Sequence, residues 1–127
     1  MAFWNAPLDC EDHADLAVKS ALEVLDATKK LNEELAPLNL PPINVGIGIS
    51  TGECIVGNMG SELRFDYSVI GDAVNLGARL EGQTRNYAGV DLLLSERTYQ
   101  LCPDRAFSEV DRIKVKGKSE QVTIYTC

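Results

Sequence analysis

The sequence has little of what metal sites are usually built from. It contains one histidine, His13, and its four cysteines stand far apart, with no Cys-x-x-Cys pair among them. Because a structural zinc ion needs closely spaced cysteine or histidine ligands, this composition argues against a zinc domain. Scattered cysteines in a chain that begins without a signal-peptide pattern indicate a reducing compartment. We therefore expect a cytoplasmic protein or the cytoplasmic part of a membrane-anchored one.

Long apolar runs and an excess of positive charge are missing as well. No stretch approaches the roughly 20 apolar residues that a membrane-spanning helix needs, so we expect no direct membrane contact. The 19 acidic residues outnumber the 12 basic ones, which gives a net charge of −7. A general nucleic-acid binder needs clustered lysine and arginine, so the composition argues against that class. An acidic protein can still bind a polyphosphate through a few local cations and helix N-termini.

What is present indicates one globular domain that mixes helices and strands. The chain has 127 residues, of which 45% are hydrophobic and 24% are charged, and this suits a single folded domain. Periodicity and turn residues predict an α/β fold (an α+β sandwich) with helices on one face of its sheet. The expected helices are one that follows the acidic stretch 9–15 and ends near 35, then 71–85 and 95–101. The expected strands are 1–4 (the end of one), 44–51, 52–57, 65–70, 90–94, 113–116 and 122–125, with 58–64 as a loop.

Two local patterns predict how these elements pack. One stripe of the first helix is apolar and should face the core, and it consists of Ala14, Ala17, Val18, Ala21, Leu22 and Leu25. In the strand 44–51, valine and isoleucine alternate with glycine, so another backbone or a ligand can approach its bare face closely. We expect this strand to form a hairpin with 52–57.

The helix expected at 71–85 carries the sharpest local signal, and Asp72 is its expected N-cap. The stripe that should face the core consists of Ala73, Leu76, Gly77 and Leu80. Asn75 and Arg79 are four residues apart, so they lie one above the other on roughly the opposite side. A guanidinium fork and an amide on one exposed helix face suit an anionic ligand. On spacing alone, the simpler interpretation, two solvated helix residues, is favoured.

Two further segments have features of phosphate binding. Lys116 and Lys118 flank Gly117 in an expected turn between strands, where two ammonium groups could hold phosphate oxygens. The simpler interpretation of this segment is a polar hairpin turn. The segment 57–61 contains two glycines but lacks the Lys-Ser/Thr of a P-loop and leads into a strand, so we reject it as a phosphate loop.

Five motifs follow one another along the chain: Met-Ala-Phe-Trp-Asn-Ala-Pro (1–7), Val-Gly-Ile-Gly-Ile-Ser-Thr-Gly-Glu (45–53), Val-Gly-Asn-Met-Gly-Ser (56–61), Phe-Asp-Tyr-Ser-Val-Ile-Gly-Asp-Ala-Val-Asn-Leu-Gly-Ala-Arg-Leu-Glu (65–81) and Val-Lys-Gly-Lys (115–118). Together they resemble the bacterial class III adenylate/guanylate cyclases. The segment 65–81 is the most specific, and the resemblance covers essentially the whole chain. It implies a ferredoxin-like nucleotidyl cyclase fold over 1–127, as a partial catalytic domain whose first strand and helix are missing.

The resemblance also implies an active site that two domains share. In this family two domains form a head-to-tail dimer, and each site lies across the interface. By motif, Asn75 would orient the ribose, Arg79 would stabilise charge on the α-phosphate, and Lys116 would bind the terminal phosphates. Ser68 falls at the position that helps choose the base, and the register of the motif favours it over Asp66. The implied substrate is ATP, with GTP as the alternative, and the implied partner is a second copy or another cyclase domain.

Two motifs of the family are absent from the sequence. The metal-binding aspartates of the family lie in an Asp-Ile-x-Gly-Phe-Thr segment and in a Gly-Asp pair just before the counterpart of 1–3, and neither motif is present in that context. The intact family domain uses Mg²⁺ or Mn²⁺ to activate the ribose 3′-hydroxyl and to balance charge on the leaving pyrophosphate. We therefore expect this chain alone to bind no metal ion and to be inactive or nearly so.

Other interpretations of the chain stay open. It could complement a full-length domain by donating Asn75, Arg79 and Lys116 to the metal aspartates of a partner. It could instead be a genuine non-catalytic dimerisation or regulatory module that uses the dimer surface. A ferredoxin-like nucleotide-binding domain with another chemistry is the least favoured, because the segment 65–81 is so specific.

Overall fold

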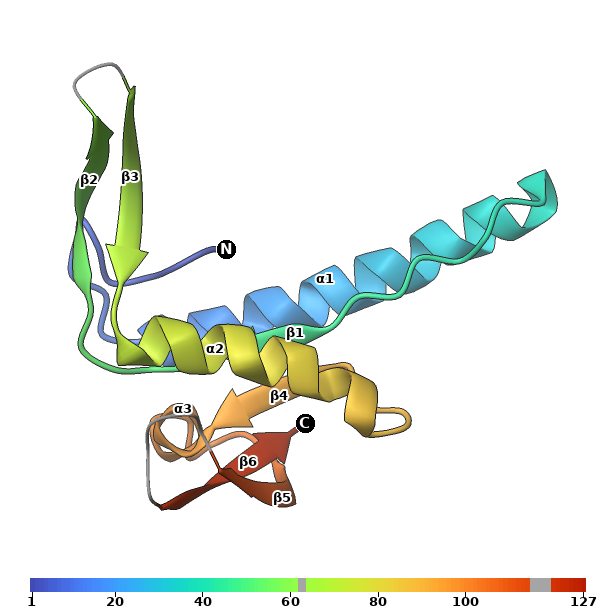
Figure 1. Ribbon diagram of the computed structural model, residues 1–127. Coiled ribbons are helices and arrows are strands. Elements are labelled where there is room, and N and C mark those ends of the chain that lie inside the picture. The colour runs from blue at the N-terminus through green and yellow to red at the C-terminus, as the bar shows by residue number, and fades with distance from the viewer. Residues whose placement is uncertain (62–63, 115–119) are drawn as a thin grey trace.

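The computed structural model describes residues 1–61, 64–114 and 120–127, which form one four-stranded sheet, one two-stranded hairpin and the helices packed on them (Figure 1). The helices are α1 (His13–Leu35), α2 (Asp72–Gln83) and α3 (Glu96–Gln100), with short 3₁₀ turns η1 (Ala36–Leu38) and η2 (Thr84–Asn86). The strands are β1 (Ile47–Ile49), β2 (Ile55–Ser61), β3 (Arg64–Ile70), β4 (Leu92–Ser95), β5 (Ser108–Lys114) and β6 (Gln121–Thr126). Within the described ranges, none of the helices combines the length and the apolar character needed to cross a membrane.

The four-stranded sheet has the order β1-β4-β6-β5. β1 runs parallel to β4, with Ile47 opposite Leu92, and β6 runs antiparallel to both β4 and β5. A parallel pair needs a long crossover connection. Here the crossover from β1 to β4 contains the hairpin β2–β3 and the helix α2, which carries the candidate site.

The core lies on both sides of β4. Leu92 and Leu94 pack with the apolar stripe of α1, whereas Leu93 packs with Leu80 of α2 and Ile124 of β6. Successive side chains of a strand point to opposite faces of the sheet, so α1 and α2 cover opposite faces. The expected placement of the helices on one face is therefore wrong. The run of three leucines is typical of a strand that is buried on both faces.

Helix α1 follows the sequence pattern closely. Ala14, Ala17, Val18 and Ala21 are buried, and Leu22 and Leu25 pack against the same cluster, as the stripe predicted. The helix ends at Leu35, and Pro37 lies in the 3₁₀ turn that follows it. Its far end extends beyond the sheet (Figure 1).

The expected hairpin between 44–51 and 52–57 is wrong. β1 pairs with β4, and the hairpin is formed instead by β2 and β3, with Ile55 opposite Ile70 and Ser61 opposite Arg64. The segment 58–64 was expected to be a loop because of its turn-forming residues. Most of it is strand, because cross-strand pairing outweighs the weak intrinsic preference of such residues.

The first residues do not form the expected strand at 1–4. A strand needs a hydrogen-bonded neighbour, and the described chain places none beside this segment. The ring of Phe3 lies instead against the ring of Tyr67 in β3, with 5.8 Å between the ring centroids. The N-terminal segment therefore packs on the hairpin through a side chain and not through its backbone.

Helix α2 packs unusually close to β1. A Cβ atom at Gly48 would lie 2.2 Å from the carbonyl oxygen of Gly77 and 2.4 Å from the amide nitrogen of Glu81, so the two backbones are in direct contact. The expected close approach to the glycine face of this strand is confirmed. Gly71, and not Asp72, occupies the N-cap position, and Asp72 is the first helical residue. Its carboxylate still suits this place, because the helix dipole favours negative charge in the first turn.

Candidate functional site

The outer face of α2 presents the two residues that the sequence singled out. Asn75 and Arg79 are both exposed, one helical turn apart, whereas Leu80 on the inner side is completely buried. The helix is held against the sheet by Leu80 and by the contact with Gly48. The positions of Asn75 and Arg79 are therefore set by a helix that is packed on the sheet, as a binding site requires.

Arg79 also reaches a second element. Its Nη2 atom donates a hydrogen bond to the backbone carbonyl oxygen of Lys114, at 3.4 Å, across 35 residues of sequence. Lys114 is the last residue of β5, so this bond ties the exposed face of α2 to the end of that strand. An arginine side chain has five N–H donors, and this bond uses one of them.

A second contact joins the same two parts of the chain. The hydroxyl of Tyr87, just after η2, donates a 2.7 Å hydrogen bond to the carboxylate of Asp111 in β5. This bond lowers the pKa of Asp111 and raises the pKa of Tyr87. Both shifts favour the state in which the phenol donates to the carboxylate, so near neutral pH β5 is held beside the end of α2.

Lys116, predicted to bind terminal phosphates, lies outside the described residues. The whole segment 115–119 does, so the interpretation of Val-Lys-Gly-Lys as a phosphate-binding turn stays a prediction. The structure does describe Lys114, the residue that precedes this segment, and Arg79 contacts its backbone carbonyl.

Ser68, the predicted base-selecting residue, lies in β3 directly opposite Gly57 of β2. Its side chain is half-buried. The hairpin stands away from the four-stranded sheet, and α2 begins at the base of β3 (Figure 1). Ser68 thus lies seven residues before Asn75, on the strand that leads into the helix bearing Asn75 and Arg79.

The acidic residues of the described chain do not fit a metal site. Among residues 1–61, 64–114 and 120–127, no group of three or more histidine, cysteine, aspartate or glutamate side chains is close enough to hold a metal ion. Asp12 accepts a hydrogen bond from the Cys10 thiol, and Asp15 is paired with Arg105. The Arg105 guanidinium lowers the pKa of Asp15 through this bond. These two carboxylates have structural partners within the chain.

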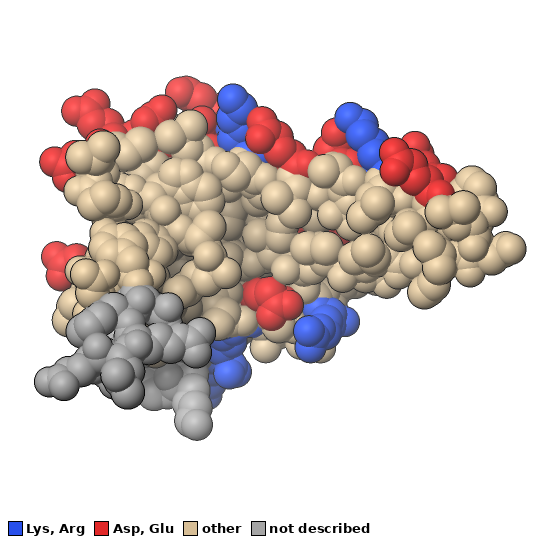
Figure 2. All heavy atoms as spheres, turned by 90° about the horizontal axis from the view of Figure 1, so that it is seen from above, with Lys and Arg blue, Asp and Glu red and all other residues tan. Residues whose placement is uncertain are grey.

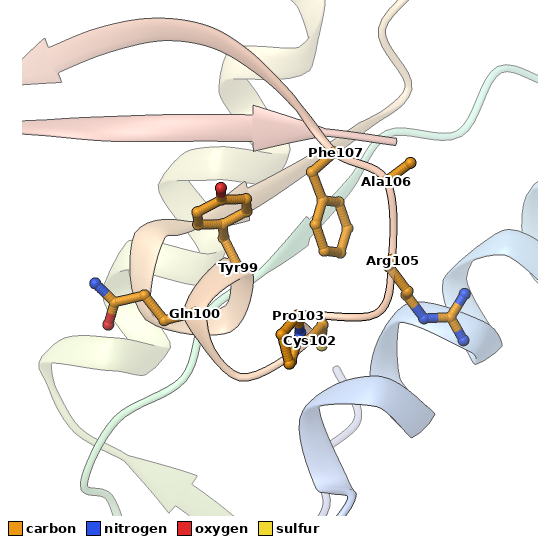
Figure 3. A pocket seen from close by; sticks show the side chains of 7 residues that line it. All are labelled: Tyr99, Gln100, Cys102, Pro103, Arg105, Ala106 and Phe107. Atoms are coloured by element: carbon orange, nitrogen blue, oxygen red, sulfur yellow. The ribbon is translucent and has the colours of Figure 1, made fainter.

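A pocket of about 390 Å³ lies elsewhere, between α3 and the loop that leads to β5 (Figure 3). Its aromatic lining is engaged internally, since Tyr99 stacks on Tyr125 with 4.0 Å between centroids and meets Phe107 edge-on at 5.7 Å. Its one cation, Arg105, turns toward α1 and is paired there with Asp15. The arginine of this pocket is therefore less available to a phosphate group than Arg79 on the exposed face of α2.

Figure 2 shows how charged side chains are distributed over one face of the molecule. In the face shown in Figure 2, charged side chains gather at the rims, acidic ones outnumber basic ones, and the middle carries few charges. The lysines and arginines visible there stand apart from one another. A nucleic-acid backbone needs a continuous basic surface, which the described residues visible on this face do not form.

Sequence reasoning missed two residues that the structure brings to attention. Lys114 contributes a backbone carbonyl, which no side-chain pattern can reveal. Gly57 is a glycine inside a strand, directly opposite Ser68. Glycine within a strand often marks a close approach of another group. The expected strand 52–57 ended at Gly57, with a loop at 58–64 after it, so this glycine was not recognised as lying inside a strand.

Comparisons with known proteins agree with this geometry. The sequence model of the family described as "Adenylate and Guanylate cyclase catalytic domain" matches residues 1–126. Adenylate cyclase 1 of Rhizobium meliloti (strain 1021) is 35% identical over 125 residues, which are 98% of this chain. The chain spans only 19% of the length of that relative.

Two solved structures share the fold. The adenylyl cyclase CyaB from P. aeruginosa has a TM-score of 0.85 and 31% sequence identity, over 98% of this chain and 63% of that one. The guanylyl cyclase Cya2 has a TM-score of 0.81 and 35% identity, over 98% of this chain and 61% of that one.

Proposed function

The chain belongs to the adenylate and guanylate cyclase catalytic-domain family, and we propose that it supplies the ribose and phosphate contacts of a shared cyclase active site. The reaction would convert ATP into cyclic AMP and pyrophosphate. The observation that carries this proposal is the joint presentation of Asn75 and Arg79 on a rigid helix face, with Arg79 hydrogen-bonded to Lys114 at the end of β5.

Arg79 is proposed to stabilise negative charge on the α-phosphate as the ring closes. A donor that is already in place when charge develops costs little reorganisation, and removing one such donor typically lowers the rate by about 10²–10³-fold. The bond to the Lys114 carbonyl restrains the guanidinium while its other donors stay available. Asn75, one turn earlier, is proposed to orient the ribose, so that the attacking 3′-hydroxyl is aligned with the phosphorus.

Lys116 is proposed to bind the terminal phosphates. The support is indirect: Lys114 lies beside Arg79, and Lys116 follows two residues later in the sequence. An ammonium group near the leaving pyrophosphate would balance its charge as a compact point charge.

Ser68 is proposed to contact the base, with ATP as the preferred substrate and GTP as the alternative. A serine hydroxyl can donate to an acceptor or accept from a donor, so it meets the edge of either purine. The comparisons include both an adenylate cyclase and a guanylyl cyclase at 35% identity. The base preference is therefore a matter for measurement, and Ser68 is the residue to test.

The metal-binding half of the site is proposed to come from a partner cyclase domain. No cluster among the described residues suits a metal ion, and the metal aspartates of the family would be those of the partner. With such a partner, Mg²⁺ or Mn²⁺ would serve the reaction, and residues 1–127 alone would be inactive. The same observation also favours a second candidate function, a dimerisation partner that regulates without catalysing.

A mixing experiment separates these functions. The chain is combined with the catalytic domain of CyaB in which the counterparts of Asn75 and Arg79 are replaced by alanine, and cyclic AMP is measured with ATP and Mg²⁺ or Mn²⁺. The proposed function predicts product from the mixture and none from either protein alone. Heterodimer formation without product would favour the regulatory function and contradict the catalytic one.

A further inference from the structure

β2 contains a glycine that nothing within the described chain requires. A Cβ atom added at Gly57 would meet no other atom within 4 Å, and the backbone there is not in the left-handed region that favours glycine. Two other glycines have visible reasons: Gly48 touches the backbone of α2, and a Cβ atom added at Gly71 would lie 3.0 Å from the carbonyl oxygen of Glu53. Glycine inside a strand lowers stability, so its presence at 57 points to a group from outside this chain.

The space above Gly57 lies beside Ser68. The two residues are directly opposite in the antiparallel hairpin, so their side-chain positions share one face and lie about 4.5–5.5 Å apart at Cβ. Ile55 and Ile70, two residues away along each strand, form the next pair on that face, and they are 67% and 51% exposed. Among the described side chains of this face, one hydroxyl group and two exposed aliphatic groups border an open place.

This arrangement has the chemistry of a purine site. A flat aromatic base needs an apolar surface against its ring and one or two polar groups at its edge. We propose that Gly57 is a specificity-determining residue, whose missing side chain admits the base of the nucleotide against β2 with its edge toward Ser68. The proposal rests on the proposed function and extends it from Ser68 to the opposite strand.

The test uses the mixture with the defective CyaB domain and three variants of this chain. Gly57→Ala and Gly57→Val add a side chain above β2. Asn58→Ala is the matched control, because Asn58 is exposed, adjacent in the same strand, and paired with Tyr67 on the other face. Two quantities are measured: the KM for ATP, and the inhibition constant of inorganic tripolyphosphate, which carries the phosphate charge but has no base.

We expect Gly57→Val to raise the KM for ATP by about tenfold or more, as pocket misfits of one or two methyl groups do, with a smaller rise for Gly57→Ala. The inhibition constant of tripolyphosphate should stay unchanged in all variants, and Asn58→Ala should leave both constants unchanged. The melting temperature of Gly57→Ala should equal or exceed that of the wild type, because the added Cβ meets no atom of the described residues.

Three outcomes would overturn the assignment. An unchanged KM for ATP in Gly57→Val would mean that the base does not lie above Gly57. Loss of the heterodimer in sedimentation would mean that Gly57 faces the partner subunit, and a lowered melting temperature would mean a role in folding. A wild-type mixture that forms heterodimer but no product would contradict the proposed function itself, and this extension with it.

Discussion

Among single residues, Arg79 is the one on which the proposed function depends most. It stands on a helix that is locked to the sheet, and its guanidinium is restrained by the carbonyl of Lys114. Its place on the molecule is thus set by packing within the described chain.

Ser68 is expected to influence the choice between ATP and GTP. Replacing Ser68 by alanine removes the hydroxyl that could donate to or accept from the edge of the base. In the mixture with the defective CyaB domain, we expect the ratio of kcat/KM for ATP to that for GTP to change by several-fold, because each substrate loses a different hydrogen bond. Thr51→Ser is a suitable control, since it keeps a hydroxyl at a position that lies outside the hairpin and is hydrogen-bonded to Thr98. An unaltered ratio would place base selection elsewhere.

The Asp15–Arg105 pair is expected to make stability depend on pH in acid. Arg105 lowers the pKa of Asp15 in the folded chain, so the pair stabilises the fold above the ordinary carboxyl pKa and loses this effect as the pH falls through the lowered value. Asp15→Asn should reduce the free energy of unfolding at pH 7 by less than about 1 kcal/mol, because the pair is partly exposed.

The measurement is the free energy of unfolding of the wild type and of Asp15→Asn, obtained with a denaturant from pH 7 down to acidic pH. The difference between wild type and Asp15→Asn should be constant near neutrality and should shrink below about pH 4, where the unfolded carboxylate becomes protonated. A difference that grows in acid would contradict the role assigned to this pair.

At the scale of elements, the contact between β1 and α2 positions the site. Gly48 lets the two backbones touch, and α2 carries Asn75 and Arg79 on its outer face. Gly48→Ala would place a Cβ atom 2.2 Å from the carbonyl oxygen of Gly77, so the helix must shift. We expect this substitution to lower the free energy of unfolding by about 1–3 kcal/mol or more.

The matched control for this element is Gly57→Ala, where the added Cβ meets no atom of the residues that the structure describes. Chemical denaturation of the two variants gives the comparison directly. Equal stability of Gly48→Ala and the wild type would contradict the close packing of α2 on β1, and with it the account of how Asn75 and Arg79 are held in place.

The elements also show what sequence reasoning could and could not reach. Local periodicity predicted three features that the structure contains: the apolar stripe of α1, the strand β3 and the exposed pair Asn75 and Arg79 on α2. The pairing of strands is not local. β1 finds its partner in β4 across the whole crossover, and β2 extends through residues that resemble a loop. Such pairings depend on tertiary contacts, which no local pattern contains.

At the scale of the whole molecule, the mixed α/β fold and the resemblance to class III cyclases are both confirmed. The family followed from specific motifs, above all the segment 65–81. The opposite placement of α1 and α2 did not follow from them, although the three leucines of β4 contained the signal. The roles proposed for Asn75, Arg79, Ser68 and Lys116 remain predictions.

The central claim is that this chain donates Arg79 to an active site completed by a partner. The most direct test is the initial rate of cyclic AMP formation in the mixture with the defective CyaB domain, measured with wild-type chain and with Arg79→Ala at equal heterodimer concentration. We predict product with the wild-type chain and a rate lower by about 10²–10³-fold with Arg79→Ala. Equal rates from the two chains, or no product from a mixture shown to contain heterodimer, would contradict the claim.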